Sequence, residues 1–150
     1  MFADKSKILA ALCGVLAMTL TGLAWAGPKI ESWETSNGAR VMFVAAPDPP
    51  ILDLRVVFDA GSARDGESSG LAALTSAMLS QGAGEWNADA VAERLESVGA
   101  ELSIGSERDM AYASARTLTE KGPMDTALGT LAAVLAKPRF EQSDFDRVRE

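Results

Sequence analysis

The side chains that most often carry out catalysis are scarce in this 150-residue chain. It contains no histidine, and its single cysteine is Cys13. Four serines that could act as nucleophiles lie in one region: Ser62, Ser68, Ser69 and Ser76. Because a serine hydroxyl needs a neighbouring base to become a nucleophile, the absence of histidine excludes a Ser-His-Asp triad.

Carboxylates that could bind a metal are present, but their spacing does not match a calcium-binding loop. The candidates in the same region are Asp59, Asp65, Glu67 and Asp109. Calcium loops place their oxygen ligands at fixed intervals, which these residues do not follow, so we interpret them as surface charges. The segment Gly82-Ala-Gly84 is too short for a phosphate-binding loop.

The first 26 residues have the pattern of a secretory signal. Two lysines precede an apolar run over 8–23, and Ala24-Trp25-Ala26 offers the small residues of a cleavage site. The alternative is a membrane anchor, but the run is short for a span and is interrupted by polar residues. We therefore expect cleavage after Ala26 and a periplasmic or secreted product with no membrane span after cleavage.

The length and composition of the whole chain are those of a globular protein with one domain. The chain is 47% hydrophobic and 23% charged, with a formal net charge of −7. Phosphate backbones are bound by basic surfaces, and this chain has no cluster of lysines and arginines. Nucleic acid is therefore excluded as an expected partner.

The first half of the domain is predicted to contain three strands and a helix. Strands over 30–35 and 39–45 flank Ser36-Asn37-Gly38, a strong hairpin signal, and alternating apolar residues predict a half-buried strand over 52–58. Apolar residues at helical spacing then predict a helix within 70–82, which Ser68 or Ser69 can cap. On periodicity alone, it is a core helix with small residues for close packing.

The second half is predicted to add two helices, two strands and the start of a further helix. A helix capped by Asn87 and stopped by Gly99 precedes strands over 101–106 and 110–118, whose alanines predict a face packed beneath helices. A helix follows from Gly122, and Ser143 is expected to cap another. The order β-β-β-α-α-β-β-α predicts an α+β fold, an antiparallel sheet with helices packed on one side.

Four motifs resemble, in order, the M16 family of zinc peptidases, which includes insulinase, pitrilysin and the mitochondrial processing peptidase. They are Phe58-Asp-Ala-Gly-Ser-Ala-Arg-Asp, the helix Gly70-Leu-Ala-Ala-Leu-Thr-Ser-Ala-Met-Leu, Ala83 after it, and Val98-Gly-Ala-Glu-Leu. The resemblance covers roughly 30–150. It implies the M16 half-domain fold, with 27–150 as an N-terminal domain that is incomplete at its C-terminal end.

The resemblance also shows which chemistry is missing. In active members the helix reads Gly-Leu-Ala-His-x-x-Glu-His-Met-Leu, with two histidines on zinc and the glutamate as general base. Those three positions fall at Ala73, Ser76 and Ala77. We expect no catalytic residue and no metal ligand in this segment, with zinc present only in an active partner or a later domain. A third ligand would fall beyond Glu150.

A peptide-binding strand is implied at Ser103-Ile104-Gly105-Ser106. In active relatives the corresponding strand is a sheet edge that pairs with an extended substrate through backbone hydrogen bonds. Backbone pairing does not depend on side-chain identity, so it can survive loss of the zinc ligands. The alternative is an edge strand that is covered or merely polar.

The resemblance leads to three hypotheses of function. The favoured one is an inactive M16-like subunit that forms a heterodimer with an active, His-x-x-Glu-His-bearing subunit and helps enclose a peptide. The second is a structural subunit of a periplasmic assembly. The third is a zinc peptidase whose motif lies in a later domain beyond residue 150.

Overall fold

The computed structural model describes residues 27–149, so the predicted signal and its cleavage after Ala26 lie outside the described residues. The chain divides into two units, Met1–Ala45 and Ala46–Glu150. Each unit is described by itself below. None of the helices in the described part of the chain combines the length and apolar character needed to cross a membrane.

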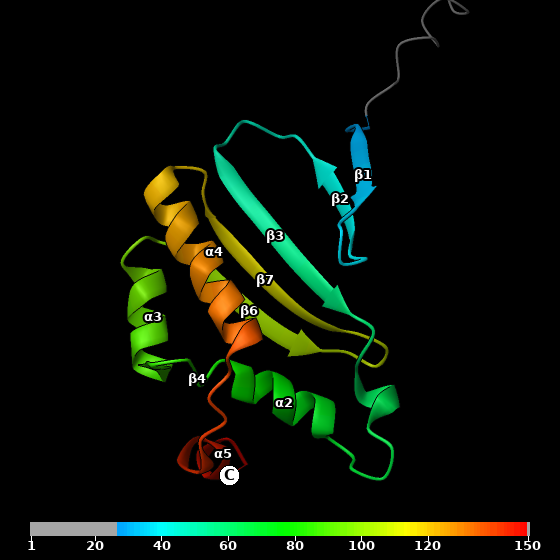
Figure 1. The fold of residues 1–150 in the computed structure, drawn as a ribbon, viewed down its shortest axis with the longest axis vertical. Helices are drawn as coiled ribbons and strands as arrows, with labels where there is room; N and C mark the ends of the chain where they lie inside the picture. Colours follow the sequence, from blue (N-terminus) through cyan, green and yellow to red (C-terminus); the bar gives the residue numbers. More distant parts are fainter. Residues whose placement is uncertain (1–26, 150) are drawn as a thin grey trace, which may run out of the picture. The chain divides into compact units, whose positions relative to one another are not determined.

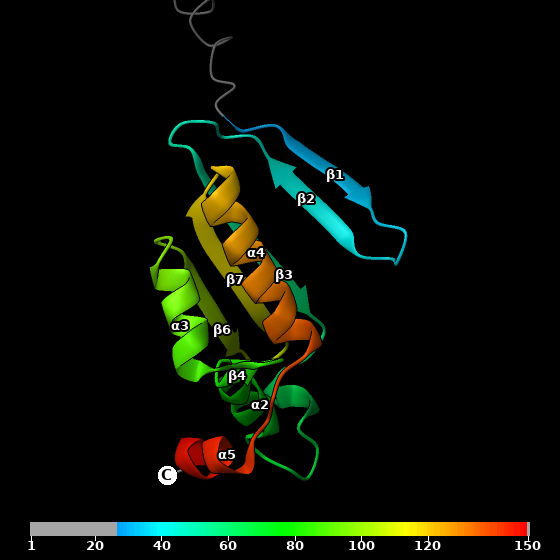
Figure 2. The same ribbon diagram turned by 60° about the vertical axis from the view of Figure 1, so that its left-hand side comes forward.

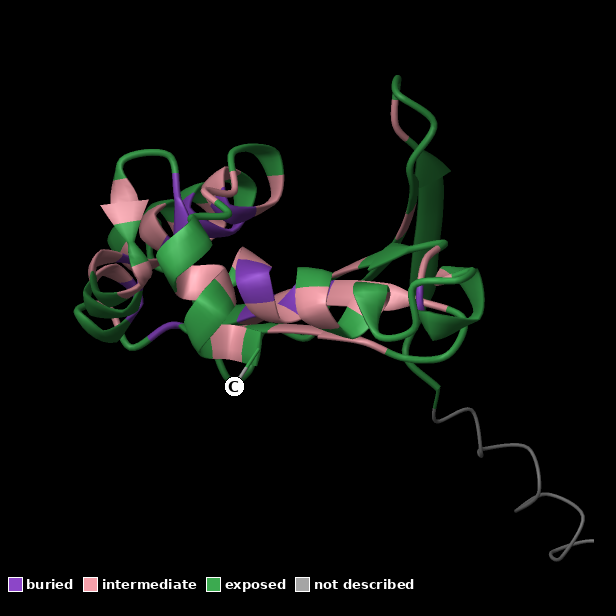
Figure 3. Ribbon diagram, turned by 90° about the horizontal axis from the view of Figure 1, so that it is seen from below, coloured by how far each residue is buried: buried purple, intermediate pink, exposed green. Residues whose placement is uncertain are grey.

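The first unit contains the predicted hairpin. Strand β1 (Ile30–Glu34) pairs antiparallel with β2 (Arg40–Val44), with Ile30 opposite Val44 and Glu34 opposite Arg40. The backbone N–H of Gly38 donates to the carbonyl oxygen of Thr35 at 2.9 Å, which closes the Asn-Gly turn. Both strands are exposed along nearly their whole length (Figure 3).

The second unit is built on a three-stranded antiparallel sheet in the order β3-β7-β6 (Figure 1). Its strands are β3 (Ile51–Phe58), β6 (Glu101–Ser106) and β7 (Ala111–Leu118). The helical segments are η1 (Ser62–Arg64), α2 (Leu71–Leu79), α3 (Ala88–Glu96), α4 (Lys121–Ala136) and α5 (Gln142–Arg149). A two-residue ladder joins β4 (Gly82–Ala83) to β5 (Trp86–Asn87).

Helices α3 and α4 lie against one face of this sheet (Figure 2). The alanine face of β7 is packed beneath α4, as predicted: Ala113 and Ala115 are buried and form a cluster with Leu131. Small side chains at these positions let the helix approach the sheet closely. The α+β prediction, with helices on one side of an antiparallel sheet, is therefore confirmed.

A second apolar cluster joins α3 to α4. Val91 and Leu95 of α3 pack with Ala127 and Val134 of α4, and all four are buried. The predicted cap of α3 is confirmed, because the side-chain oxygen of Asn87 accepts a hydrogen bond from the Ala90 backbone N–H at 2.9 Å. These contacts fix α3 and α4 as a pair over the sheet.

Three local predictions were wrong. Neither Ser68 nor Ser69 caps α2, whose N-cap is Gly70. Ser143 does not precede α5 but lies inside it, because the helix starts at Gln142. Strand β3 is less buried than its alternation suggested, and Phe58 is 42% exposed, since no helix covers that end of the strand as fully as α4 covers β7.

Candidate functional site

Helix α2 carries the three positions that correspond to the zinc-binding motif. Ala73 is exposed, Ala77 is half-buried, and Ser76 is buried with 7% of its surface accessible. Residues four apart on a helix lie on the same side, so Ala73 and Ala77 share one face. All three positions therefore lie on α2, and none carries a zinc-binding side chain.

These side chains do not fit a zinc ion. A methyl group offers no lone pair, and a neutral serine hydroxyl is not among the ligands that hold catalytic zinc. Within residues 27–149 there is no group of three or more His, Cys, Asp or Glu side chains that could hold a metal ion. The α2 region therefore has neither a metal site nor the carboxylate base that a zinc peptidase requires.

The start of α2 is held by a residue that the sequence analysis had assigned to the surface charges. The Asp65 carboxylate accepts hydrogen bonds from the backbone N–H of Gly70 at 2.8 Å and of Ala72 at 2.9 Å. These N–H groups have no partner within the helix, and a carboxylate at a helix start also interacts favourably with the helix dipole. Asp65 thus does the capping that was predicted for a serine.

The loop that carries Asp65 is fastened to the turn between β6 and β7. The backbone N–H of Ser62 donates to the Glu107 carbonyl at 3.0 Å, and that of Ala63 donates to the Arg108 carbonyl at 2.7 Å. Gly61 makes this approach possible, because it has φ of 124° and any Cβ there would lie 2.7 Å from the Glu107 oxygen. The position of α2 is therefore tied to the end of β6.

An open hollow of about 450 Å³ lies beside α2, and Ser76 is one of its lining residues. Most of the lining is apolar, including Phe58, Leu71, Leu79 and Leu135. A glutamate at position 76 would enter these surroundings as a charged group, whereas serine is small and neutral. The hollow is therefore largely apolar, and of the three motif positions only Ser76 lines it.

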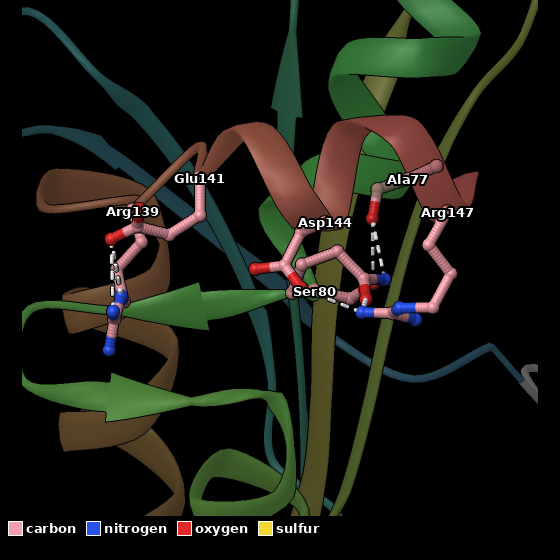
Figure 4. Close-up of polar contacts among 7 residues, drawn as sticks. Ala77, Ser80, Arg139, Glu141, Asp144 and Arg147 are labelled. Carbon is pink, nitrogen blue, oxygen red and sulfur yellow. Dashed lines mark hydrogen bonds and ion pairs between the residues drawn. The ribbon is translucent and has the colours of Figure 1, made fainter. Parts of the chain in front are cut away.

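The C-terminal end of α2 is held by α5 (Figure 4). The side-chain amide of Gln81 donates to the Ala77 carbonyl at 3.1 Å, and Arg147 donates to the Gln81 side-chain oxygen at 2.9 Å. Arg147 also pairs with Asp144 at 2.8 Å, which positions its guanidinium group. Both ends of α2 are therefore fixed by side-chain contacts outside the helix.

The predicted peptide-binding segment, Ser103 to Ser106, lies in β6, which pairs on one side with β7 and has no second strand partner among the described residues. Leu102 and Ile104 pack against the helix-side core. Helix α2 packs against β6, so the edge strand and the motif helix are neighbours. The segment is an edge strand, as predicted; its binding of peptide stays a prediction.

The other face of the sheet is mixed: exposed Ile51, Val57 and Leu118 share it with polar side chains, and its central strand carries a paired charge. Arg116 donates two hydrogen bonds to the Asp53 carboxylate, at 2.7 and 3.0 Å. This hydrogen-bonded pair lowers the pKa of Asp53 and raises that of Arg116 from their ordinary values. Nearby, the Arg55 guanidinium lies over the Tyr112 ring, 4.0 Å from its centroid.

Sequence reasoning missed three residues that shape this region: Asp65, Tyr112 and Arg116. The only signal for Asp65 was an acidic residue a few positions ahead of a helix. Tyr112 and Arg116 alternate with the alanines of β7, so their place on the opposite face could be inferred. Their partners could not, because Asp53 and Arg55 come from a strand far away in sequence.

Comparisons with known proteins agree with this geometry. The family model for insulinase, peptidase family M16, matches residues 40–150. The crystal structure of a peptidase M16 inactive domain from Pseudomonas fluorescens matches with 39% identity and a TM-score of 0.78, covering 81% of this chain and 29% of that one. No match is found among curated proteins.

Two further solved structures share the fold at lower identity. A protease from Helicobacter pylori matches with 19% identity and a TM-score of 0.70, covering 82% of this chain and 29% of that one. The ferredoxin protease FusC, in complex with Arabidopsis ferredoxin, matches with 24% identity and a TM-score of 0.70, covering 84% of this chain and 14% of that one. This chain therefore spans less than a third of each of these structures.

The family match extends over most of the chain, from β2 to α5, and includes the helix in which Ala73, Ser76 and Ala77 replace the zinc motif. The chain belongs to the insulinase family of peptidases, family M16.

Proposed function

We propose that this chain is a non-catalytic M16 domain that pairs with an active, His-x-x-Glu-His-bearing M16 subunit and helps bind an extended peptide along β6. One observation carries the proposal. Helix α2 packs against β6, a strand with no second strand partner within residues 27–149, and its motif positions hold Ala73, Ser76 and Ala77. The 39% identity to a peptidase M16 inactive domain supports the non-catalytic part of the proposal.

The structure of α2 argues for a maintained non-catalytic element. Asp65 holds the start of the helix and the Gln81–Arg147 link holds its end. In a helix without a function, such contacts would contribute only to stability. A helix that flanks a peptide-binding edge gains a fixed position relative to that edge.

The edge of β6 is the feature that suits peptide binding. An exposed edge presents unpaired N–H and C=O groups, and an extended peptide can add to it as a further strand. Such pairing uses backbone groups on both sides. It therefore needs none of the side chains that zinc catalysis requires.

Co-purification tests the pairing. The full-length protein, tagged and expressed in its natural host, is purified under native conditions and its companions are identified by mass spectrometry. A stoichiometric companion with a His-x-x-Glu-His motif supports the proposal. Recovery of the protein alone and free of zinc contradicts the heterodimer.

A complementation assay then tests whether the pairing matters for catalysis. The peptidase rate and the substrate KM of the companion are measured with and without the full-length protein. The proposal predicts that one or both change when the protein is added. No change in either quantity would leave a structural subunit as the better account.

The same purified protein distinguishes the proposal from two alternative functions. A structural subunit assembles stably and is indifferent to added peptide. A zinc peptidase with its motif in a later domain binds zinc and cleaves peptide by itself. The domain that we propose neither binds zinc nor cleaves peptide without its partner.

We further propose that the protein acts in the periplasm or is secreted, after cleavage near Ala26. The support is the pattern of residues 1–26, with lysines, an apolar run and Ala24-Trp25-Ala26 in order. N-terminal sequencing of the protein from a periplasmic fraction tests this. A mature chain that starts at Gly27 agrees with it, and an intact Met1 in the cytoplasm contradicts it.

A further inference from the structure

Within residues 27–149, the face of the sheet opposite α3 and α4 presents side chains in rows that end at the unpaired edge of β6. The strand register places members of β3, β7 and β6 side by side on this face. The three rows are Asp53–Arg116–Glu101, Arg55–Ser114–Ser103 and Val57–Tyr112–Gly105. A peptide that added to β6 would contribute the next member of each row.

Charges alternate along the first row. Arg116 directs both of its hydrogen bonds to Asp53, and within residues 27–149 no cation lies at ion-pair distance from Glu101. Glu101 is exposed and is the last member of the row before the edge. A lysine or arginine opposite Glu101 would continue the alternation, whereas an acidic residue there would face a like charge.

The third row ends differently, because Gly105 has no side chain. The Tyr112 ring lies over it: a Cβ at Gly105 would be 2.8 Å from the Tyr112 hydroxyl oxygen. One face of this ring is covered by the Arg55 guanidinium. The phenol therefore extends across β6 towards the edge, where a large side chain opposite Gly105 can pack beside it.

The middle row separates these two positions with small side chains. Ser103 and Ser114 line an open hollow of about 310 Å³, together with Glu101, Arg55 and Arg116. A hollow of this kind restricts the peptide residue opposite Ser103 much less than its neighbours two positions away. Selection should therefore occur at the two outer rows.

We propose that β6 selects extended peptides with a lysine or arginine opposite Glu101 and an aromatic residue opposite Gly105, four positions apart. The order of the two depends on the direction of the peptide, but their spacing does not, because alternate residues of a strand share a face. This inference rests on the proposed peptide-binding function and specifies its ligand.

Fluorescence anisotropy with the full-length protein and labelled nine-residue peptides tests the selectivity. One pair of peptides carries Lys and Phe four positions apart, in both orders, in a background of serine and threonine. The matched peptides replace Lys by Glu, replace Phe by Ser, or set Lys and Phe five positions apart. We expect one Lys–Phe peptide to bind roughly threefold to tenfold more tightly than each matched peptide.

The five-residue spacing controls for simple charge attraction to an acidic protein. It keeps the composition of the peptide and moves one of the two side chains to the opposite face of the added strand. Equal affinity for the two spacings would mean that net charge, rather than the rows, determines binding. That result overturns the inference.

Two variants test the assigned residues. Glu101→Lys should reverse the charge preference, so that the peptide with Glu binds more tightly, whereas Glu96→Lys on α3 makes the same charge change and should leave the preference intact. Tyr112→Thr should remove the preference for Phe and keep that for Lys. A preference for Lys that persists in Glu101→Lys would place the recognition elsewhere and overturn the inference.

The outcomes separate this inference from the function on which it rests. If every peptide binds with the same affinity, peptide binding stands and the selectivity fails. If no peptide binds, both the proposed peptide binding and the selectivity fail.

Discussion

Helix α2 and strand β6 are neighbours, yet the substitutions in them have different consequences. At the motif positions of α2, Ala73, Ser76 and Ala77 remove every group that could hold zinc or activate water. In β6, the edge that has no strand partner within residues 27–149 depends on the backbone and on the strand order. The helix lacks the side chains of zinc chemistry, whereas the strand presents the backbone groups that peptide pairing would use.

The difference follows from how specific each interaction is. A zinc site needs particular donor atoms at distances near 2 Å, so a single change to alanine removes a ligand entirely. Strand addition relies on N–H and C=O groups that nearly every residue carries. Replacement of the zinc ligands therefore abolishes hydrolysis, whereas strand addition does not depend on those side chains.

The largest predicted effect comes from restoring the motif. The variant Ala73→His, Ser76→Glu, Ala77→His should be destabilised by about 3 kcal/mol without metal, because position 76 is buried beside an apolar hollow. Zinc at about 100 times its Kd should raise the free energy of unfolding by about 2.7 kcal/mol. Urea denaturation with and without zinc, together with titration calorimetry, measures both quantities.

The control for this experiment keeps Ser76 and restores only the two histidines. This double variant should bind zinc without the large loss of stability in the metal-free state. If neither variant gains stability from zinc, then α2 does not present the two positions at a spacing that zinc can bridge. In that case α2 would differ from an active site in its backbone as well as in its side chains.

The next effect concerns the start of α2. Asp65→Ala leaves the N–H groups of Gly70 and Ala72 without their acceptor and should lower the free energy of unfolding by about 1–2 kcal/mol. Hydrogen exchange of the α2 amides should accelerate. Asp109→Ala, an exposed turn carboxylate, is the control and should change stability by less than about 0.5 kcal/mol. Equal effects of the two variants would show that Asp65 does not act as a cap.

A smaller effect is expected at the other end of the helix. Gln81→Ala removes the link between the Ala77 carbonyl and Arg147 and should cost about 0.5–1 kcal/mol. Exchange of the α5 amides should increase more than that of α4. Gln142→Ala, whose partner Asp146 lies within α5 itself, is the matched control. Unchanged exchange in α5 would mean that apolar contacts alone dock it.

The smallest effect is the pH dependence of the sheet face. The pKa of Asp53 is lowered in the folded protein by its hydrogen bonds to Arg116. Its stabilising contribution is therefore present above the ordinary carboxyl range and is lost as the pH falls through the lowered value. At neutral pH the wild-type protein should have a higher urea midpoint of unfolding than Asp53→Asn. The two midpoints should become equal at acid pH. A constant difference across this range would contradict the assignment.

The sequence predicted those elements whose signals are local. The Asn-Gly hairpin, the Asn87 cap and the alanine face of β7 each depend on residues within one or two elements, and all are observed. The resemblance located Ala73, Ser76 and Ala77 on α2, because a helix carries its register in the sequence.

The contacts that position the site were not predictable in the same way. The Asp65 cap, the Asp53–Arg116 pair and the Tyr112 ring over Gly105 join residues whose proximity depends on the tertiary fold. Serine at a helix start is a good cap by local rules, but a carboxylate from the preceding loop occupies that role here. Asp65 is only five residues before Gly70, but the path of the loop that brings its carboxylate to the helix start depends on contacts with the turn between β6 and β7.

A short stretch after α4 has a consequence for the order in which the domain folds. The N–H of Gly84 donates to the Lys137 carbonyl at 2.8 Å, and the N–H of Arg139 donates to the Gly82 carbonyl at 3.2 Å. These bonds connect the exit of α2 with the entry of α5 and close a loop that contains α3, β6, β7 and α4. Because closing a long loop is entropically costly, we expect these two hydrogen bonds to form late, after the sheet and α4. Refolding followed by pulsed hydrogen exchange should protect the amides of β7 first and those of Gly84 and Arg139 last.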